Sequence, residues 1–409
     1  MEWIKDKRSI SADARVPIKS WCPDPEPEAL AQAANLAAHP EVEGHVALMP
    51  DCHVGFGMPI GGVIACPRAV IPNAVGVDIG CGMGAVRTSQ PAETVADRTR
   101  LRAILEDIKR RIPVGEGHSH RSRQDWKGFE TFLDSLGDET PGWLGAQGLD
   151  LDRKNLGTLG GGNHFIELQA DTEGTLWIML HSGSRNLGYR IASHYHKRAL
   201  ALNQRWQSRL PAADLAFLPI DCEEGQAYLR DMQFALAYAA ENRRRMLAVV
   251  KEVLADHLPR IAFVQEINIH HNYAAREEHF GRQVWVHRKG ATAARRGELG
   301  IIPGSMGTSS YIVRGRGNPD SFASCSHGAG RVMGRAEASR RLTLEECDRA
   351  MEGIVFDRWP RSGGGKRRGG AFDFGEAPQA YKDIDRVIAQ QLDLIEPLVK
   401  LRPLGVIKG

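Results

Sequence analysis

The chain has 409 residues, of which 42% are hydrophobic and 25% charged, and its formal net charge is +3 at pH 7. This composition permits a sizeable core and argues against a disordered chain, while the charge is too small to indicate a general binder of polyanions. The seven cysteines are dispersed and form no CxxC pair, which argues against a disulfide framework. No apolar run is long enough to cross a membrane, and the N-terminus does not resemble a signal peptide. We therefore expect a cytoplasmic protein with no membrane partner.

Hydrophobic periodicity divides the chain into helical and extended segments. The longest helical pattern covers residues 223–258, and a capping box at Thr343 and Glu346 begins a helix that runs to about Ile354. In chain order the predicted elements are a helix at 26–38, a strand at 45–49, strands at 62–65 and 74–77 within a glycine-rich stretch at 55–84, a helix at 92–112, the helix at 223–258, helices from about 331 and from 343, and a final helix at 383–401, kinked at Pro397.

Two segments fit no regular element. Residues 114–150 are irregular and rich in Gly, His, Arg and Asp, which predicts a mobile excursion, and residues 361–375 read as a loop rich in Gly and Arg. There is no fixed-period repeat and no convincing domain boundary. We therefore expect one large α+β domain over residues 1–409, with mixed or largely antiparallel sheets and helices packed outside.

One histidine stands out near the start of the last quarter of the chain. His327 lies between small polar residues and a Gly-Ala-Gly turn, in the stretch 324–331. A glycine-rich turn that opens a helix directs N–H groups at one point and favours phosphate, and an imidazole there could be a ligand, a proton carrier or a nucleophile. A structural histidine at a turn is the simpler alternative. Basic residues gather on both sides of it and would suit a phosphate-rich partner: Arg282, Arg288, Lys289, Arg295, Arg296, Arg314 and Arg316, and Lys366, Arg367 and Arg368.

Three other histidines share one setting, an apolar, strand-like run beside glycine or a polar residue. They are His164, His181 and His271, and each alone is more often structural than functional. Asp78 and Cys81 lie three residues apart in a glycine-rich turn, where a capping Asp and a buried Cys are the alternative. Together the five residues offer enough O, S and N ligands for two metal ions bridged by a thiolate in a central cleft. Ligand softness favours Zn²⁺, but the spacing does not identify the metal.

Two further elements are suited to a nucleotide. Asn163 and Glu167 flank His164, and the loop 303–307 offers exposed N–H groups and a hydroxyl. There is no GxxxxGK[ST] loop and no KxDG lysine of the kind that ATP-dependent ligases use, so His327 is the better candidate for a covalent nucleotide adduct. The residues by themselves therefore indicate a metal-assisted phosphoryl or nucleotidyl transferase.

At these positions the chain resembles the RtcB family of RNA ligases, over essentially its full length. Many ordered motifs carry the resemblance, which makes a chance match very unlikely. They are MPDxH at 49–53, GVDIGCG at 76–82, GTLGxGNHFIE at 157–167, HSGSR at 181–185, HHNY at 270–273, RKGA at 288–291, PGSMG at 303–307, SCSHGAGR at 324–331, AYKD at 380–383 and KG at 408–409.

The resemblance implies a GTP-dependent enzyme with two Mn²⁺ ions, in which His327 attacks the α-phosphate of GTP. RNA ending in a 2′,3′-cyclic phosphate would be opened to a 3′-phosphate, take the GMP, and be sealed to a 5′-hydroxyl end. The metal ligands would be Asp78, Cys81, His164, His181 and His271, with Cys81 bridging. The resemblance does not fix the natural RNA, in repair or in tRNA splicing, or the need for an archease-type helper.

The resemblance also implies a guanylate pocket. Asp51 would orient the His327 ring, Arg185 would contact phosphate, and Tyr381 would stack nearby. The other implied pocket residues are Asn163, His164, Phe165, Ile166, Glu167, Asn272, Pro303, Gly304, Ser305, Met306, Ser310, Gly328, Ala329, Gly330 and Lys408.

The chain also departs from the family pattern. After Gly353 it has residues 355–360 and a Gly/Arg-rich loop where members often carry a Cys-Arg-Lys-Asp-like segment, and Cys52, Phe56 and the excursion at 114–150 are unusual. These departures favour a repair-type relative. The alternatives are a metallohydrolase that only opens cyclic phosphates and an RNA-binding or scaffold relative with a relic site.

Overall fold

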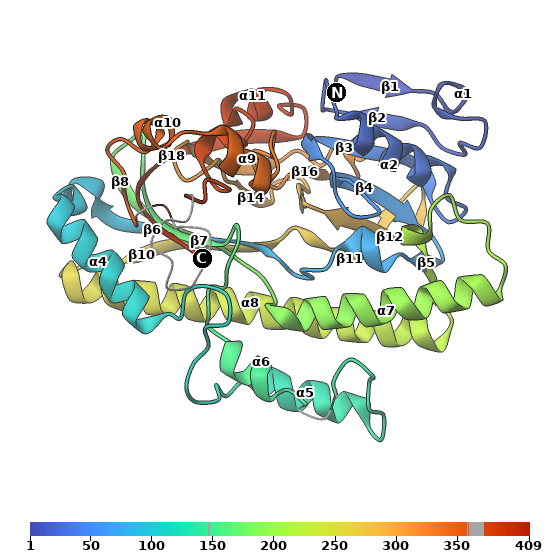
Figure 1. Ribbon diagram of the computed structural model, residues 1–409, viewed down its shortest axis with the longest axis horizontal. Helices are drawn as coiled ribbons and strands as arrows, with labels where there is room; N and C mark the ends of the chain where they lie inside the picture. The colour runs from blue at the N-terminus through green and yellow to red at the C-terminus, as the bar shows by residue number, and fades with distance from the viewer. Residues whose placement is uncertain (146–147, 358, 360–371) are drawn as a thin grey trace.

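Two large β-sheets form the centre of the molecule, and helices cover them from outside (Figure 1). This computed structural model describes residues 1–145, 148–357, 359 and 372–409. Nearly all neighbouring strands are antiparallel, and the exceptions are the pairs β2–β3 (Ile18–Ser20 and Glu43–His53) and β17–β18 (Val355–Phe356 and Ile395–Lys408). The expected α+β class, with mixed and largely antiparallel sheets, is confirmed.

The first large sheet is built from the N-terminal strands and a later hairpin. Its six strands lie in the order β1-β2-β3-β4-β12-β11. The strands not yet given are β1 (Trp3–Lys5), β4 (Ile60–Cys66), β11 (Asn272–His279) and β12 (Arg282–Lys289).

The second large sheet has eight strands, in the order β10-β6-β8-β7-β18-β15-β14 with β17 paired to β18. Two small two-stranded sheets, β13–β16 and β5–β9, complete the β structure. The remaining strands are β5 (Ala69–Val70), β6 (Gly82–Pro91), β7 (Phe165–Asp171), β8 (Thr175–Ser182), β9 (Leu218–Pro219), β10 (Phe263–His270), β13 (Ala291–Ala293), β14 (Leu299–Ile302), β15 (Ser310–Gly315) and β16 (Ser324–Ser326).

Most predicted helices are confirmed. The pattern at 223–258 is one unbroken helix of 35 residues, and both hydrogen bonds of the capping box at Thr343 and Glu346 are present. The α-helices are α1 (Lys7–Ile10), α2 (Pro27–Ala38), α3 (Pro72–Val75), α4 (Arg98–Arg111), α5 (Lys127–Leu136), α6 (Asp150–Asn155), α7 (Asn186–Arg205), α8 (Glu223–His257), α9 (Arg335–Arg341), α10 (Leu344–Ala350) and α11 (Ile384–Ala389). Short 3-10 turns lie at Ala92–Val95, Ala213–Leu215, Pro319–Ser321 and Pro378–Ala380.

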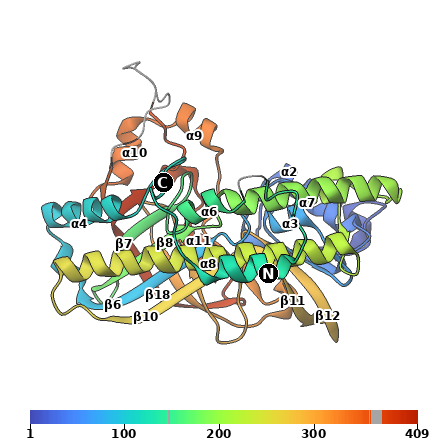
Figure 2. The same cartoon turned by 90° about the horizontal axis from the view of Figure 1, so that it is seen from below.

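The long helix α8 supports the second large sheet. Figure 2 shows α8 running across the strands of this sheet, with α4 and α7 alongside it. The apolar residues of α4 and α8 pack with those of β7 and β8 into one cluster, and the aromatic residues of α5 and α8 pack into another. This packing fixes the strand ends relative to α8, which matters for the site described below.

The predicted final helix at 383–401 is wrong. Only α11 is helical, and the chain then forms the 14-residue strand β18 between β15 and β7. Pro397 lies at a register irregularity opposite Val313, a place where a sheet tolerates the missing N–H of proline. Pairing on both edges of the strand therefore outweighs the local helical spacing.

Two other predictions are corrected. The helix expected from about 331 begins only at Arg335, so the turn after His327 does not open directly into a helix. The run at 74–77 is not a strand, because Pro72 begins the short helix α3 and Gly76 ends it with φ +97°. The turn that carries Asp78 and Cys81 is present, but a helix rather than a strand leads into it.

The excursion at 114–150 carries structure of its own. Helix α5 packs against α8 through Phe129 and Phe132, whose ring stacks on Phe234 at 3.9 Å between centroids. The mobility of this segment stays a prediction. Residues 361–371 of the predicted Gly/Arg-rich loop lie outside the described residues. None of the described helices is long and apolar enough to cross a membrane.

Most residues of the basic cluster before His327 form ion pairs with carboxylates. Arg288 is fully buried and makes a bidentate pair with Glu277, at 2.7 and 2.9 Å. Although burial opposes it, the hydrogen bond from His279 and the Arg288 guanidinium hold the pKa of Glu277 far below its usual range. Arg288 also donates to Ser324 Oγ at 2.9 Å. The guanidinium therefore supports the strand that leads to His327 and is not free for a phosphate-rich partner.

We predict that Arg288→Met lowers the free energy of unfolding by about 3 kcal/mol, because it leaves the Glu277 carboxylate buried and unpaired. Arg314 pairs with Glu396 at the surface, where both side chains are about half exposed, so Arg314→Met should cost less than about 1 kcal/mol. Chemical or thermal denaturation followed by circular dichroism measures both. Equal losses for the two variants would contradict this account.

Candidate metal centre and adjoining cavity

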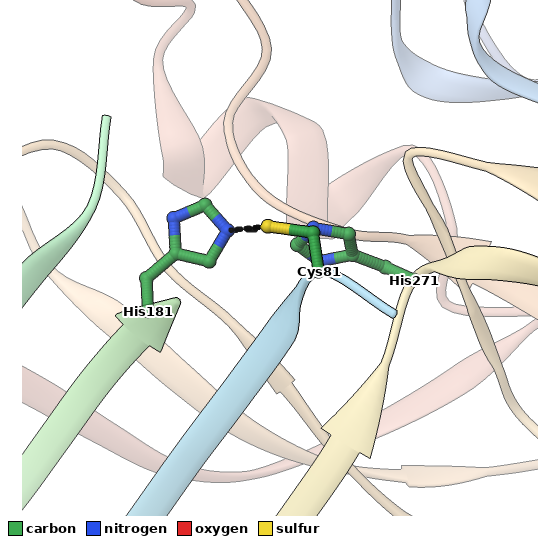
Figure 3. A group of neighbouring side chains, drawn as sticks. All are labelled: Cys81, His181 and His271. Atoms are coloured by element: carbon green, nitrogen blue, oxygen red, sulfur yellow. Dashed lines mark hydrogen bonds between the residues drawn. The ribbon is translucent and has the colours of Figure 1, made fainter. Parts of the chain in front are cut away.

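Strand register brings Cys81, His181 and His271 together. In the second sheet Gly82 faces Ser182 on β8 and His270 on β10, so Cys81 lies between the ends of these two strands. A Cβ on Gly82 would lie 1.9 Å from Ile269 O, so only glycine allows this approach. Figure 3 shows the three side chains converging from the ends of β6, β8 and β10. Their potential ligand atoms all lie within 4.8 Å of one another, and all three residues are buried.

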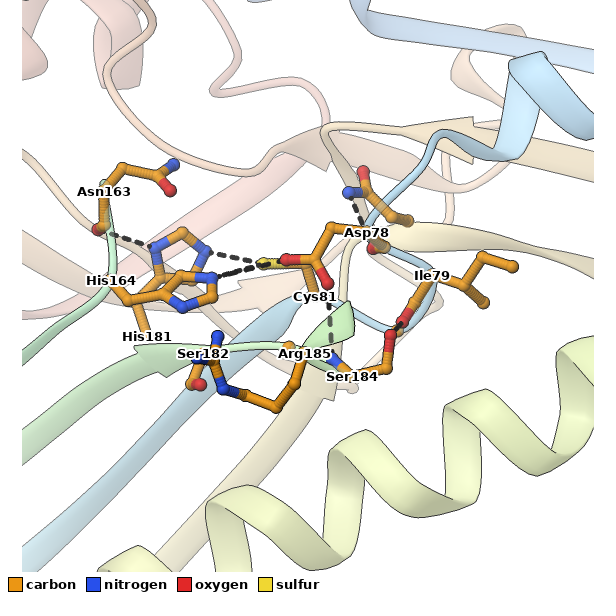
Figure 4. A network of polar contacts seen from close by, with 12 residues as sticks. Asp78, Ile79, Cys81, Asn163, His164, His181, Ser182, Ser184 and Arg185 are labelled. Carbon is orange, nitrogen blue, oxygen red and sulfur yellow. Dashed lines mark hydrogen bonds and ion pairs between the residues drawn. The ribbon is translucent and has the colours of Figure 1, made fainter. Parts of the chain in front are cut away.

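A second group of three ligands shares Cys81. Asp78, Cys81 and His164 also have their ligand atoms within 4.8 Å of one another. His164 Nε2 lies 3.3 Å from Asp78 Oδ2, and Cys81 Sγ lies 3.2 Å from His181 Nε2 (Figure 4). The five predicted ligands thus form two triads with the thiol in common, which suits two ions bridged by a thiolate.

The histidine rings are oriented by backbone carbonyl groups. His164 Nδ1 lies 2.9 Å from Leu159 O, and His181 Nδ1 lies 3.2 Å from Asn163 O. A carbonyl accepts a hydrogen bond and cannot donate one, so each Nδ1 carries the proton and each Nε2 keeps its lone pair for a metal. The buried Nδ1 of His271 has no partner among the described residues. Two of the three rings are thus held by a carbonyl group at Nδ1, with Nε2 toward the cluster.

Burial sets the protonation states. It lowers the pKa of His181 and of His271 well below the usual value, so both imidazoles are neutral near pH 7. Burial and the nearby Asp78 carboxylate raise the pKa of the Cys81 thiol well above its usual value. A metal ion must therefore displace the thiol proton, and its binding releases protons.

Two consecutive residues of α8 hold the ligand-bearing segments together. The fully buried Arg243 donates to Gly80 O at 2.8 Å and to Ser182 O at 3.0 Å. Asn242, also fully buried, accepts from Gly157 N at 2.7 Å and donates to Gly183 O at 3.1 Å. Sequence reasoning missed both residues, since nothing in a helical pattern distinguishes a buried Arg or Asn from an exposed one.

Arg185 lies beside the second triad. Its guanidinium donates from Nε to Thr158 Oγ1 at 3.1 Å, and Figure 4 places its side chain next to His164. Its backbone has φ +58° at the start of α7, an unusual conformation for a residue with a side chain. Burial lowers the pKa of Arg185, against the raising effect of the nearby Asp78 carboxylate.

His327 lies beside the metal ligands and is held by Asp51. Asp51 Oδ2 is 2.7 Å from His327 Nδ1 and also accepts from the N–H groups of His327 and Gly328, at 3.1 and 3.3 Å. The rings of His327 and His271 are 4.8 Å apart between centroids. Since the Asp51 carboxylate fixes the proton on Nδ1, the Nε2 lone pair of His327 is free to act as a ligand or a nucleophile.

A cavity of about 410 Å³ opens in front of His327, which is a volume typical of small-ligand sites. Most of the implied pocket residues form its wall: Asn163, Phe165, Pro303, Gly304, Ser305, Met306, His327, Gly328, Ala329, Gly330, Tyr381 and Lys408. His181 and His271 of the metal cluster also line it. The cavity and the cluster are thus parts of one site.

Five implied pocket residues do not line the cavity. His164 belongs to the second ligand triad, and the other four lie behind the wall. Ile166 points to the opposite face of β7 and packs in the core. Asn272 accepts from Gly290 N at 2.8 Å and donates to Asp78 O at 3.1 Å, so its amide is engaged in holding the ligand loop. Ser310 Oγ accepts from the N–H of Gly304 in the cavity wall.

Glu167 is the fourth. It is buried and accepts from Gln169 Nε2 at 2.5 Å. Burial raises the pKa of Glu167 to about 7, against the lowering effect of Lys408. The carboxyl group is therefore close to half protonated near neutral pH, just behind the wall of the cavity.

The cavity wall includes residues outside the predicted set. Arg331 and Arg335 line it, and both pair with Glu376, at 3.2 and 2.8 Å. Lys408 Nζ and Tyr381 OH also lie near Glu376, at 3.0 and 2.6 Å. Arg331 is the last residue of the 324–331 motif, so the sequence pointed to it. Nothing in the sequence pointed to Arg335 or Glu376 as site residues. This part of the wall holds three cations around one carboxylate and is suited to a phosphate group.

His53 also lines the cavity. Its Nδ1 lies 2.8 Å from the backbone oxygen of Asp51, and burial lowers the pKa of His53 to about 4. His53 belongs to the 49–53 motif, and this motif was the feature of the sequence that could have identified it as a site residue.

The sequence model of the family described as "tRNA-splicing ligase RtcB" matches residues 32–409. The chain is 39% identical to the RNA-splicing ligase RtcB of Escherichia coli K12, over 96% of this chain and 97% of that protein. It is 30% identical to the tRNA-splicing ligase RtcB of Nanoarchaeum equitans and 32% identical to that of Archaeoglobus fulgidus, over 96% and 94% of this chain and 95% and 92% of those proteins.

We predict that single substitutions separate the two triads. Asp78→Asn and His271→Ala should each remove one of the two ions, because each alters a ligand of one triad, while Cys81→Ala should remove both. Elemental analysis after dialysis against Mn²⁺ measures the bound metal per chain. Asp385→Asn, a change at an exposed carboxylate paired with Lys400, serves as the control and should keep both ions. Full occupancy in Cys81→Ala would contradict the shared-thiol arrangement.

Proposed function

The chain belongs to the RtcB family of RNA ligases, and from this premise we propose that it is a GTP- and Mn²⁺-dependent ligase that acts through a histidine–GMP intermediate on His327. Its substrates would be RNA ends that carry a 3′-phosphate or a 2′,3′-cyclic phosphate, joined to ends with a 5′-hydroxyl. The departures in sequence favour RNA repair as its role, with tRNA splicing as the alternative.

One observation carries the proposal. The His327 ring is held at Nδ1 by Asp51 at 2.7 Å, lies next to the metal ligand His271 and faces the cavity of about 410 Å³. A neutral imidazole with a fixed proton on Nδ1 presents the Nε2 lone pair in one direction, which is what a nitrogen nucleophile requires.

In the first step His327 Nε2 would form a bond to the α-phosphorus of GTP, and the bond from that phosphorus to the β-phosphate oxygen would break. Pyrophosphate would leave with the electron pair of that bond. The Asp51 carboxylate would stabilise the positive charge that develops on the ring while the proton stays on Nδ1. The Asp51–His327 contact in the free protein supports this assignment.

In the later steps the RNA 3′-phosphate would take GMP from Nε2, which restores the neutral imidazole. The 5′-hydroxyl of the second RNA end would then attack the activated 3′-phosphorus and release GMP. Arg185, whose guanidinium lies within electrostatic range of Asp78, would contact an RNA phosphate.

The guanylate would occupy the cavity. Tyr381 and Phe165 offer aromatic surfaces, and the loop 303–306 forms another part of the wall. Lys408 lines the cavity and would supply a polar contact for a base, while the hydrogen-bonded residues Glu167, Gln169 and Ser310 lie behind the wall. Gly328, Ala329 and Gly330 form the part of the wall next to His327, where the α-phosphate would lie.

The donor set fits two divalent ions. Asp78, Cys81 and His164 would hold one, and Cys81, His181 and His271 the other. The carboxylate, imidazole and thiolate ligands alone would accept Zn²⁺, and the family resemblance favours Mn²⁺. When bound, the ions supply positive charge that neutralises the phosphates of the substrate. We further propose that the protein works in the cytoplasm and that an archease-type protein assists its turnover.

A metallohydrolase that only opens cyclic phosphates is the competing function. The same ligands would serve it, but it would not need the Asp51–His327 pair or a cavity next to it. The arrangement of these two residues therefore favours the ligase.

We predict that the purified protein, with Mn²⁺ and GTP labelled at the α-phosphate, forms a labelled adduct that is acid-labile and base-stable. His327→Ala should abolish the label, and Asp51→Asn should slow its appearance by about 100-fold or more, because the ring loses its orientation and its counter-charge. Denaturing gels after timed incubation measure both rates.

His257→Ala provides the matched control, since this histidine lies at the far end of α8 and pairs with Asp107. It should label at the wild-type rate. Absence of label in the wild-type protein with metal bound would refute the ligase mechanism and favour the hydrolase.

A further inference from the structure

The orientation of His327 depends on where the backbone of strand β3 holds Asp51. The pairing of β3 with β4 is interrupted at this point, because Leu48 faces Gly62 and the next pair is His53 with Ile60. The register with β2 ends at Leu48 as well. Residues 49–52 therefore lack the ladder that fixes the rest of the strand, and their buried carbonyl groups need other partners.

A single ammonium group fills this gap. Lys382 Nζ donates to Pro50 O at 3.0 Å and to Cys52 O at 2.7 Å, the carbonyl groups on either side of Asp51. Its third donor points to Cys22 Sγ at 3.7 Å. The side chain thus substitutes for the missing strand partner on both sides of the residue that orients His327.

The backbone of Lys382 binds the turn 327–330, which carries His327. Its N–H donates to Gly330 O at 2.9 Å, and the preceding Tyr381 pairs with Arg331 as an isolated bridge. Gly330 has φ +75°, and a Cβ there would lie 2.3 Å from Asp51 O. The turn 327–330 and the backbone of Asp51 are thus in direct contact, and Lys382 is bonded to both.

The charge of Lys382 has no counter-ion in contact with it. Among the described residues its ammonium forms hydrogen bonds to carbonyl groups and a thiol and no ion pair with a carboxylate. A half-buried ammonium without such a partner is costly to keep, and a hydrogen bond from a charged donor is stronger and more directional than one from a neutral donor. The arrangement favours a role that needs a fixed backbone position.

We propose that Lys382 is a positioning residue for the formation of the histidine–GMP adduct: it fixes Asp51 against the turn 327–330 and thereby aims His327 Nε2. This inference rests on the proposed function. Lys382 lies behind Asp51 and does not line the cavity, so it is not expected to touch the nucleotide, the metal ions or the reacting atoms.

The test compares Lys382→Met with the wild-type protein in the labelling reaction with Mn²⁺ and GTP. Methionine keeps most of the volume of the stem and removes the donors and the charge. We expect the maximal labelling rate to fall about 10- to 100-fold, because a small misplacement of a reacting group lowers a rate by such a factor. The GTP concentration at half-maximal rate and the amount of bound Mn²⁺ should stay the same. Lys400→Met, which removes an exposed lysine paired with Asp385, is the control and should label normally.

A double-mutant cycle with Asp51→Asn separates positioning from a general loss of structure. If Lys382 acts through Asp51, adding Lys382→Met to Asp51→Asn should cost little more than Asp51→Asn alone. The inference would be overturned if the fold-losses in labelling rate of the two single variants multiplied in the double variant. An effect of Lys382→Met on GTP affinity alone, or a wild-type rate in that variant, would also overturn it.

A second variant covers the case in which Lys382→Met does not fold. If Lys382→Met melts below the assay temperature, the same cycle is run with Lys382→Arg, which retains the charge but cannot place both hydrogen bonds in the same geometry; a wild-type rate there would also overturn the inference. Failure of the wild-type protein to label at all would instead refute the proposed function.

Discussion

The site depends on the contact between one helix and the ends of three strands. Asn242 and Arg243 of α8 are fully buried and donate to or accept from the backbone at Gly80, Gly157, Ser182 and Gly183. These positions belong to the segments that carry Cys81, His164 and His181. In the dry interior such hydrogen bonds are strong and an unpaired partner is costly, so the segments cannot move independently. The arrangement of the candidate metal ligands is therefore a consequence of how α8 packs on the sheet.

Asp51 plays a comparable part for His327. Its carboxylate accepts from the ring and from two backbone N–H groups of the 327–328 turn, and its own backbone lies where the strand ladder is interrupted. The protein thus holds His327 through an irregular piece of backbone that is fixed by side chains. A regular strand could not bring the carboxylate, the turn and the cavity wall so close together.

Charge near the cavity is arranged in the same way. The cations that face it surround the single carboxylate of Glu376, so they repel one another less in the free protein and remain available to a phosphate-rich ligand. The basic cluster that stands out in the sequence, in contrast, is largely paired with carboxylates, and Arg288 within it supports the fold. A count of basic residues along the chain could not make this distinction, because it does not show which charges are already neutralised.

The sequence by itself determined the α+β class and most helices, and it singled out the five candidate metal ligands, His327 and much of the cavity wall, because these depend on local periodicity and on motifs whose residues stay close in the chain. It did not determine the fate of residues 395–408, where pairing with β15 and β7 outweighs helical spacing, nor the start of α9. Only the tertiary structure revealed Arg243, Glu376 and Lys382 as partners of the site. Their side chains meet backbone or charges more than 40 residues away, and a contact of that kind leaves no periodic pattern in the sequence.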